Sequence, residues 1–90
     1  MLLHSELKQK AFNKEQALYK HIFNIDKDWL NKSDKVVVSV YTNEHGLIKY
    51  IERPFKPEDL TEGVNMINLS SPLALPAGSY NFKVDYVKED

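Results

Sequence analysis

The chain contains no cysteine and only three glycines among its 90 residues. Without cysteine there can be no disulfide bond and no thiolate metal site, which favours a reducing compartment. Three glycines leave little material for a phosphate-binding loop, and no Walker-type or nucleophile-elbow motif occurs. These absences give catalysis no support, and we expect a protein that is not an enzyme and uses no cofactor.

Long apolar runs and a strong charge of one sign are absent as well. No run approaches the roughly 20 apolar residues that span a bilayer, and the polar N-terminus lacks the core of a signal peptide. Residues 1–35 carry seven lysines against five acidic residues, and residues 36–90 carry five basic against eight acidic residues. Without a signal peptide or a membrane span, we expect a cytoplasmic protein that does not bind membrane. Because no concentrated basic face is visible, we expect no binding of nucleic acid.

The composition that remains is that of an ordinary globular protein. Hydrophobic residues make up 42% of the chain, aromatic residues 11% and charged residues 28%, which is too apolar for intrinsic disorder. A chain of this length forms at most one domain. We therefore expect a single domain over residues 1–90, with a change of character near residue 35.

Residues 1–35 carry apolar residues at helical spacing, which predicts a helical segment through about Ile22. The stripe consists of Leu7, Ala11, Leu18 and Ile22. A competing pattern has period two and consists of Tyr19, His21, Phe23 and Ile25. Short apolar runs do not separate helix from strand, so helix is favoured here and strand stays open. A polar connection over residues 26–34 follows, in which the aspartates cap a turn.

Residues 36–90 have the texture of antiparallel β structure. Residues 36–42 and 47–53 predict a hairpin whose turn places Gly46 in a left-handed conformation. One helical turn is expected at residues 57–60, a third strand at 64–69, and a tight connection at 71–76.

The final strand has the clearest pattern in the chain. Its large residues alternate with polar ones, and they are Tyr80, Phe82, Val84 and Tyr86. Side chains on a strand point to opposite faces with period two. This face is therefore predicted to lie in the core, while Asn81, Lys83 and Asp85 are predicted to face water.

No metal site is expected. The histidines at positions 4, 21 and 45 are far apart and lack the spacing of a helical metal site. Residues 26–37 depart from a calcium loop, because Asn31 and Val37 stand where glycine and glutamate are needed. The carboxylates Glu58, Asp59 and Glu62 fit a solvated turn better than a catalytic pair.

Three aromatic residues are the candidate binding residues: Trp29, Tyr41 and Tyr50. Tryptophan is enriched among interface hot spots, and the two tyrosines could extend a surface along the predicted hairpin. The structural interpretation is favoured for each of them. Trp29 would cover one end of the sheet, and the tyrosines would pack across the strands.

A resemblance to a known family is carried by three sets of residues: 38–41 with 46–48, 60–65 with 67–69, and 75–80. Together, over residues 36–87, they resemble the C-terminal hairpins of immunoglobulin-like β-sandwich modules. The resemblance implies a non-catalytic binding or assembly role, with a protein or a carbohydrate as partner. It covers slightly more than half of the chain and carries over no binding residue.

We therefore predict a mainly β domain, an antiparallel sheet or small sandwich, with an N-terminal helical segment. The alternative is an α+β domain in which the helix covers one sheet. The expected function is a small interaction module that binds a protein partner or self-associates through an open strand edge. The alternative function is a carbohydrate-binding β-sandwich module.

Overall fold

The computed structural model describes residues 1–89, and most of them lie in strands. The strands are β1 (Leu2–Phe12), β2 (Gln16–Ile25), β3 (Lys35–Thr42), β4 (Ile48–Phe55), β5 (Gly63–Leu75) and β6 (Gly78–Val87). A short helix, α1 (Lys27–Lys32), and one 3-10 turn, η1 (Pro57–Asp59), complete the described elements. The prediction of a mainly β, antiparallel fold is confirmed. No helix in this part of the chain is long and apolar enough to cross a membrane.

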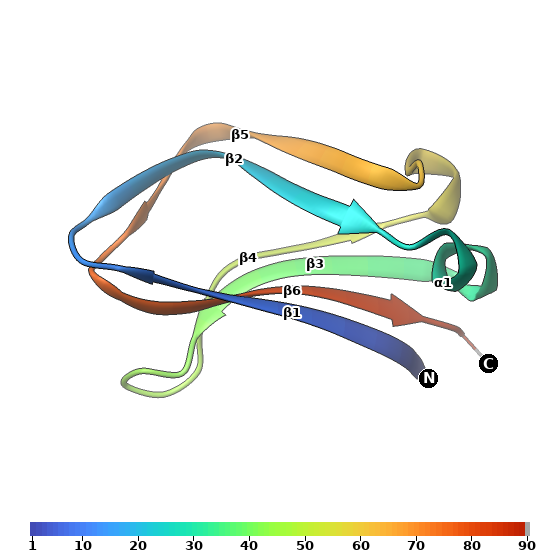
Figure 1. Ribbon diagram of the computed structural model, residues 1–90, viewed down its shortest axis with the longest axis horizontal. Coiled ribbons are helices and arrows are strands. Elements are labelled where there is room, and N and C mark those ends of the chain that lie inside the picture. Colours follow the sequence, from blue (N-terminus) through green and yellow to red (C-terminus); the bar gives the residue numbers. More distant parts are fainter. Residues whose placement is uncertain (90) are drawn as a thin grey trace.

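The two ends of the chain form one long antiparallel ribbon that folds over on itself (Figure 1). β1 pairs with β6 as far as Phe12 and Gly78, and the pairing resumes between β2 and β5 from Gln16 and Leu75. The hairpin of β3 and β4 adds to the free side of β6. The result is a four-stranded sheet in the order β1-β6-β3-β4, covered by the two-stranded sheet β2-β5.

The predicted N-terminal helix is wrong, because this segment forms strands β1 and β2. Leu7 and Ile22, two members of the predicted stripe, are 54% and 56% exposed. The buried residues are His21, Phe23 and Ile25, which follow the competing period-two pattern. Pairing with β5 and β6, both distant in sequence, outweighs local helical spacing here. The second layer of the fold is therefore a sheet, and the α+β alternative with a covering helix is wrong too.

The predicted hairpin is confirmed as β3 and β4, which pair from Val36 to Thr42. Gly46 is left-handed as expected, with φ of 94°, and the preceding His45 is left-handed as well, with φ of 62°. Pro54 lies inside β4 and does not end it, since proline is tolerated on an edge strand whose outer side needs no donor.

The connection predicted at residues 71–76 is wrong, because β5 continues through it to Leu75. The register between β2 and β5 shifts there: Leu18 pairs with Leu73, whereas Lys20 pairs with Asn68. Extra residues of β5, Pro72 among them, are accommodated in this irregularity, a position where proline is compatible with a strand. The expected helical turn is confirmed as η1.

The core lies between the two sheets in two clusters. The first consists of Phe23, Ile25 and Ile67 from β2 and β5, packed against Val36, Val38, Val84 and Tyr86. The second consists of Val40, Leu75 and Tyr80. The predicted core face of β6 is thus confirmed for Tyr80, Val84 and Tyr86, with Phe82 half-buried beside them. Asn81, which was expected to face water, is buried.

Helix α1 closes one end of the layers, and its start is specified by Asp26. The carboxylate Oδ1 of Asp26 accepts hydrogen bonds from the backbone N–H groups of Asp28 (2.9 Å) and Trp29 (3.2 Å). The backbone N–H of Asp26 donates to the hydroxyl of Tyr86 at 2.9 Å, which ties the cap to the core. An aspartate at this position satisfies donors that the first helical turn leaves free.

Candidate functional site

The three aromatic residues singled out from the sequence lie in different surroundings. Trp29 packs half-buried against the first core cluster and stacks on His4, with ring centroids 4.6 Å apart. Tyr50 packs edge-on against Tyr80, 5.6 Å between centroids, at the second cluster. Tyr41 lines a shallow hollow on the outer face of the larger sheet. They form no common platform, so glycan binding gains no support from their arrangement and stays a prediction.

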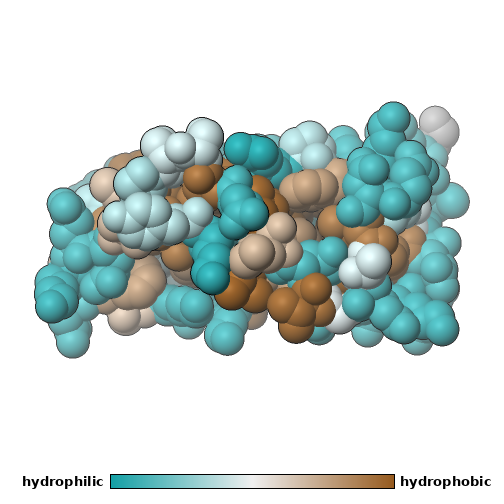
Figure 2. Space-filling model, turned by 90° about the horizontal axis from the view of Figure 1, so that it is seen from above, coloured by the Kyte–Doolittle hydropathy of each residue, from teal (hydrophilic) through white to brown (hydrophobic). Residues whose placement is uncertain are grey.

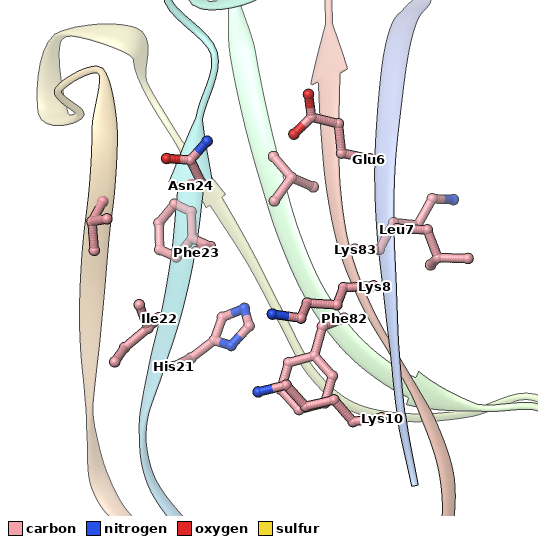
Figure 3. Close-up of a pocket in the computed structure, with 12 residues that line it drawn as sticks. Glu6, Leu7, Lys8, Lys10, His21, Ile22, Phe23, Asn24, Phe82 and Lys83 are labelled. Atoms are coloured by element: carbon pink, nitrogen blue, oxygen red, sulfur yellow. The ribbon is translucent and has the colours of Figure 1, made fainter.

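A groove of about 340 Å³ lies between the layers, where the outer edges of β1 and β2 face each other (Figure 3). Its lining comes from β1, β2, β6 and one residue of β5. The two edges are unpaired because β1 bonds only to β6 and β2 bonds only to β5. The bend of the long ribbon separates these two edges and so creates the groove.

His21 is the unusual residue of this groove. Its ring is 2% exposed and points from β2 toward β1, between Phe23 (5.6 Å between centroids) and Phe82 (5.4 Å) (Figure 3). Among residues 1–89, neither Nδ1 nor Nε2 has a hydrogen-bond partner. Burial lowers the pKa of His21 below its ordinary value, and the positive charge of Lys10 lowers it further. The imidazole is therefore neutral at pH 7, with one donor and one acceptor unused.

Two lysines of β1 reach across the groove toward His21 (Figure 3). The ammonium group of Lys10 lies 5.0 Å from the ring centroid of Phe82. Neither Lys8 nor Lys10 forms a salt bridge within the described chain, whereas Glu6 lies 3.5 Å from His4 and Lys83 lies 3.5 Å from Asp85. The groove thus holds two ammonium groups without a salt bridge and a single carboxylate, Glu6, which leaves an excess of positive charge.

A second candidate feature is strand β5, an edge strand without a charged residue. Its 13 residues run from Gly63 to Leu75 and include no lysine, arginine, aspartate or glutamate. The outward side chains of Val64 and Met66 are 73% and 51% exposed, and Met66 lies opposite Ile22 on β2. Figure 2, which views the molecule from the β2–β5 side, shows apolar residues interrupting the polar surface. Unpaired, uncharged edges are templates for pairing with another chain.

Histidine and carboxylate side chains do not gather in the part of the chain that the structure describes. Within residues 1–89, no group of three or more histidine and carboxylate side chains is placed to hold a metal ion. The acidic residues Glu58 and Asp59 lie in the first turn of η1, at the surface.

Sequence reasoning missed both features, although signals for each were present. His21 belongs to the period-two pattern in residues 19–25, which marks it as an inward-facing strand residue once strand is preferred over helix. The absence of charge over residues 63–75 is visible in the sequence, but its importance depends on β5 lying at a sheet edge.

No family model, curated protein or solved structure matches this chain.

Proposed function

We propose that this protein is a non-catalytic interaction module that binds a protein partner by strand addition at the edge of β5. The observation that carries the proposal is the 13-residue, uncharged edge strand with Val64 and Met66 exposed beside it. In strand addition, main-chain hydrogen bonds supply affinity, and alternate side chains supply specificity.

The contrast with the other edges supports β5 as the binding strand. Edge strands β1 and β2 carry Lys8, Lys10 and Lys20, and edge strand β4 carries Lys49, Arg53 and Pro54. Charges and proline on an edge strand oppose pairing with a second chain. β5 has a proline only near its far end and no charge at all. Its open edge is therefore the one at which strand addition meets least opposition.

A second copy of the chain is one partner that fits this edge. Two β5 strands that pair antiparallel around a twofold axis would join their two-stranded sheets into one four-stranded layer. Exposed apolar side chains such as Met66 and Val64 would then gain neighbours on the joined face. Self-association and binding of a different protein both use the same edge in this proposal.

The test places positive charge on β5 and measures association. In the variant Met66→Lys/Asn68→Lys, both new lysines lie on exposed positions outside the groove. The matched control is Leu47→Lys/Asn43→Lys, which adds the same two positive charges at exposed positions flanking the turn between β3 and β4. Sedimentation velocity over a wide range of concentration reports self-association, and affinity capture with a tagged chain reports other partners.

The proposal predicts that the wild type and the control associate with a partner or with themselves. The β5 variant should lose at least about tenfold in affinity, equivalent to about 1.4 kcal/mol. Its thermal stability should change little, because surface substitutions usually stay within about 0.5 kcal/mol. If the β5 variant and the control associate equally well, or if the wild type remains a monomer without any partner, the proposal is wrong.

A further inference from the structure

The groove between β1 and β2 has the charge of an anion site. Lys8 and Lys10 extend over it, and neither ammonium group has a carboxylate partner within residues 1–89 (Figure 3). Two like charges on one face repel each other, and an anion placed between them removes that repulsion. This arrangement favours a ligand with negative charge at the β1 side of the groove.

His21 provides an independent indication that something polar belongs in the groove. A buried donor or acceptor without a partner destabilises the protein, and both ring nitrogens of His21 are in that state. Lys8 and Lys10, which lie over the groove, are long and exposed, so they can move to admit a ligand. A ligand oxygen that accepts a hydrogen bond from the imidazole N–H would relieve part of this destabilisation.

Apart from Glu6, Asn24 and Lys83, the rest of the lining is apolar, which favours a ligand with a hydrocarbon part. Phe82, Phe23 and Val84 form the inner wall, and Ile22 and Val64 lie at the rim on the β2 side. The volume of about 340 Å³ is at the small end of the range for ligand pockets. A small molecule with an apolar body and one charged end matches both parts of the lining.

Carboxylate suits these residues better than phosphate does. The only arginine of the chain, Arg53, lies on β4 and does not line the groove. Without arginine neither anion is held in a bidentate pair, and the lysines act as point charges that the two oxygens of one carboxylate can share. A singly charged carboxylate also loses less hydration than a phosphate dianion on entering an apolar groove.

We propose that the groove between β1 and β2 binds a small organic monocarboxylate. Its carboxylate lies between the ammonium groups of Lys8 and Lys10 and accepts a hydrogen bond from the imidazole of His21. Its hydrocarbon part lies against Phe82 and Phe23. This site is distinct from the edge of β5, and the proposal does not depend on strand addition there.

The experiment titrates the protein with hexanoate and follows backbone and imidazole nitrogen signals by NMR. Acetate, which lacks the apolar body, and 1-hexanol, which lacks the charge, are the matched probes. Hexanoate should shift the ring nitrogen signals of His21 and the amides around Lys8 and Ile22 with saturation. Each matched probe should bind at least about tenfold more weakly than hexanoate.

Variants separate this site from nonspecific attraction to a lysine-rich surface. Lys8→Gln/Lys10→Gln should weaken hexanoate binding by about tenfold or more. The control Lys14→Gln/Lys20→Gln removes the same charge from exposed positions that do not line the groove, and it should bind as the wild type does. A spectrum with unchanged dispersion shows for each variant that the fold is retained.

Three results would overturn the proposal. The first is the absence of saturable shifts with hexanoate at concentrations of tens of millimolar, well above the micromolar to millimolar range of ordinary ligands. The second is equal binding of 1-hexanol, which would show an apolar cavity without a carboxylate site. The third is equal loss of affinity in the two lysine variants, which would show that only the overall charge matters.

Discussion

At the scale of single residues, His21 makes the stability of the core depend on pH. Its folded-state pKa is lowered, first by burial and then by Lys10, so the unfolded chain binds a proton more readily than the folded one. Stability then rises with pH wherever the unfolded state holds more protons. The stability that depends on neutral His21 is fully present above the ordinary histidine pKa of about 6.5, and it falls as the pH drops below that value.

We expect His21→Phe to remove this dependence and to stabilise the protein. Phenylalanine keeps an aromatic ring between Phe23 and Phe82 and eliminates the two unpartnered nitrogens. At about pH 7.5 the free energy of unfolding should rise by about 1 kcal/mol, and the gain should be larger at about pH 5.5. Urea unfolding at both pH values measures it.

The matched control is His45→Asn, which changes an exposed histidine in the β3–β4 turn at a left-handed position that asparagine tolerates. This variant should keep the pH dependence of the wild type. A wild-type free energy of unfolding that stays level between the two pH values would contradict the assignment of His21 as a buried neutral base.

At the scale of elements, helix α1 depends on its cap. Asp26→Ala removes the acceptor of two backbone hydrogen bonds at the start of the helix. Loss of such a cap costs about 0.5–2 kcal/mol, and we expect a decrease of about 1 kcal/mol in the free energy of unfolding. Because Trp29 lies in the first turn and packs on His4, its fluorescence should also shift toward the red.

Asp26→Asn is the control that keeps the helix cap, since asparagine caps helices about as well as aspartate. Its stability and tryptophan emission should stay close to those of the wild type. If the alanine and asparagine variants lose equal stability, the negative charge of Asp26 matters rather than its hydrogen bonds.

The elements also show which parts of the fold local sequence can predict. The β3–β4 hairpin was predictable because its turn and its β-branched strands specify it locally. Strand β6 was predictable because large and polar residues alternate from Tyr80 to Tyr86. β1 was not predictable, because its exposed Leu7 and Lys8 show no inward alternation and its pairing partner β6 lies at the opposite end of the chain. Because of this long-range pairing, residues 1–25 form two strands although their apolar residues have helical spacing.

The candidate sites were less predictable than the fold for a related reason. Residue type and the predicted hairpin indicate Trp29, Tyr41 and Tyr50 as candidates, but these residues pack in separate surroundings in the structure. The groove brings together His21 of β2 and Lys10 of β1, which face each other only because the ribbon bends between these strands. No local pattern in the sequence predicts that bend.

At the scale of the whole molecule, the two layers are unequal. Four strands lie in one sheet and two in the other, and the smaller sheet ends at the unpaired edge of β5. The larger sheet ends at β1 and β4, whose charges and proline discourage further pairing. This contrast supports the proposal that association takes place at the edge of the smaller sheet.

Amide hydrogen exchange, measured at increasing protein concentration and with any captured partner present, tests that claim most directly. Amides at a free strand edge exchange quickly, and pairing with another chain protects them. We predict that exchange slows at the alternate β5 amides that do not bond to β2, while exchange along β4 is unchanged. Protection that appears along β1 or β4 instead, or along no edge, would contradict the claim.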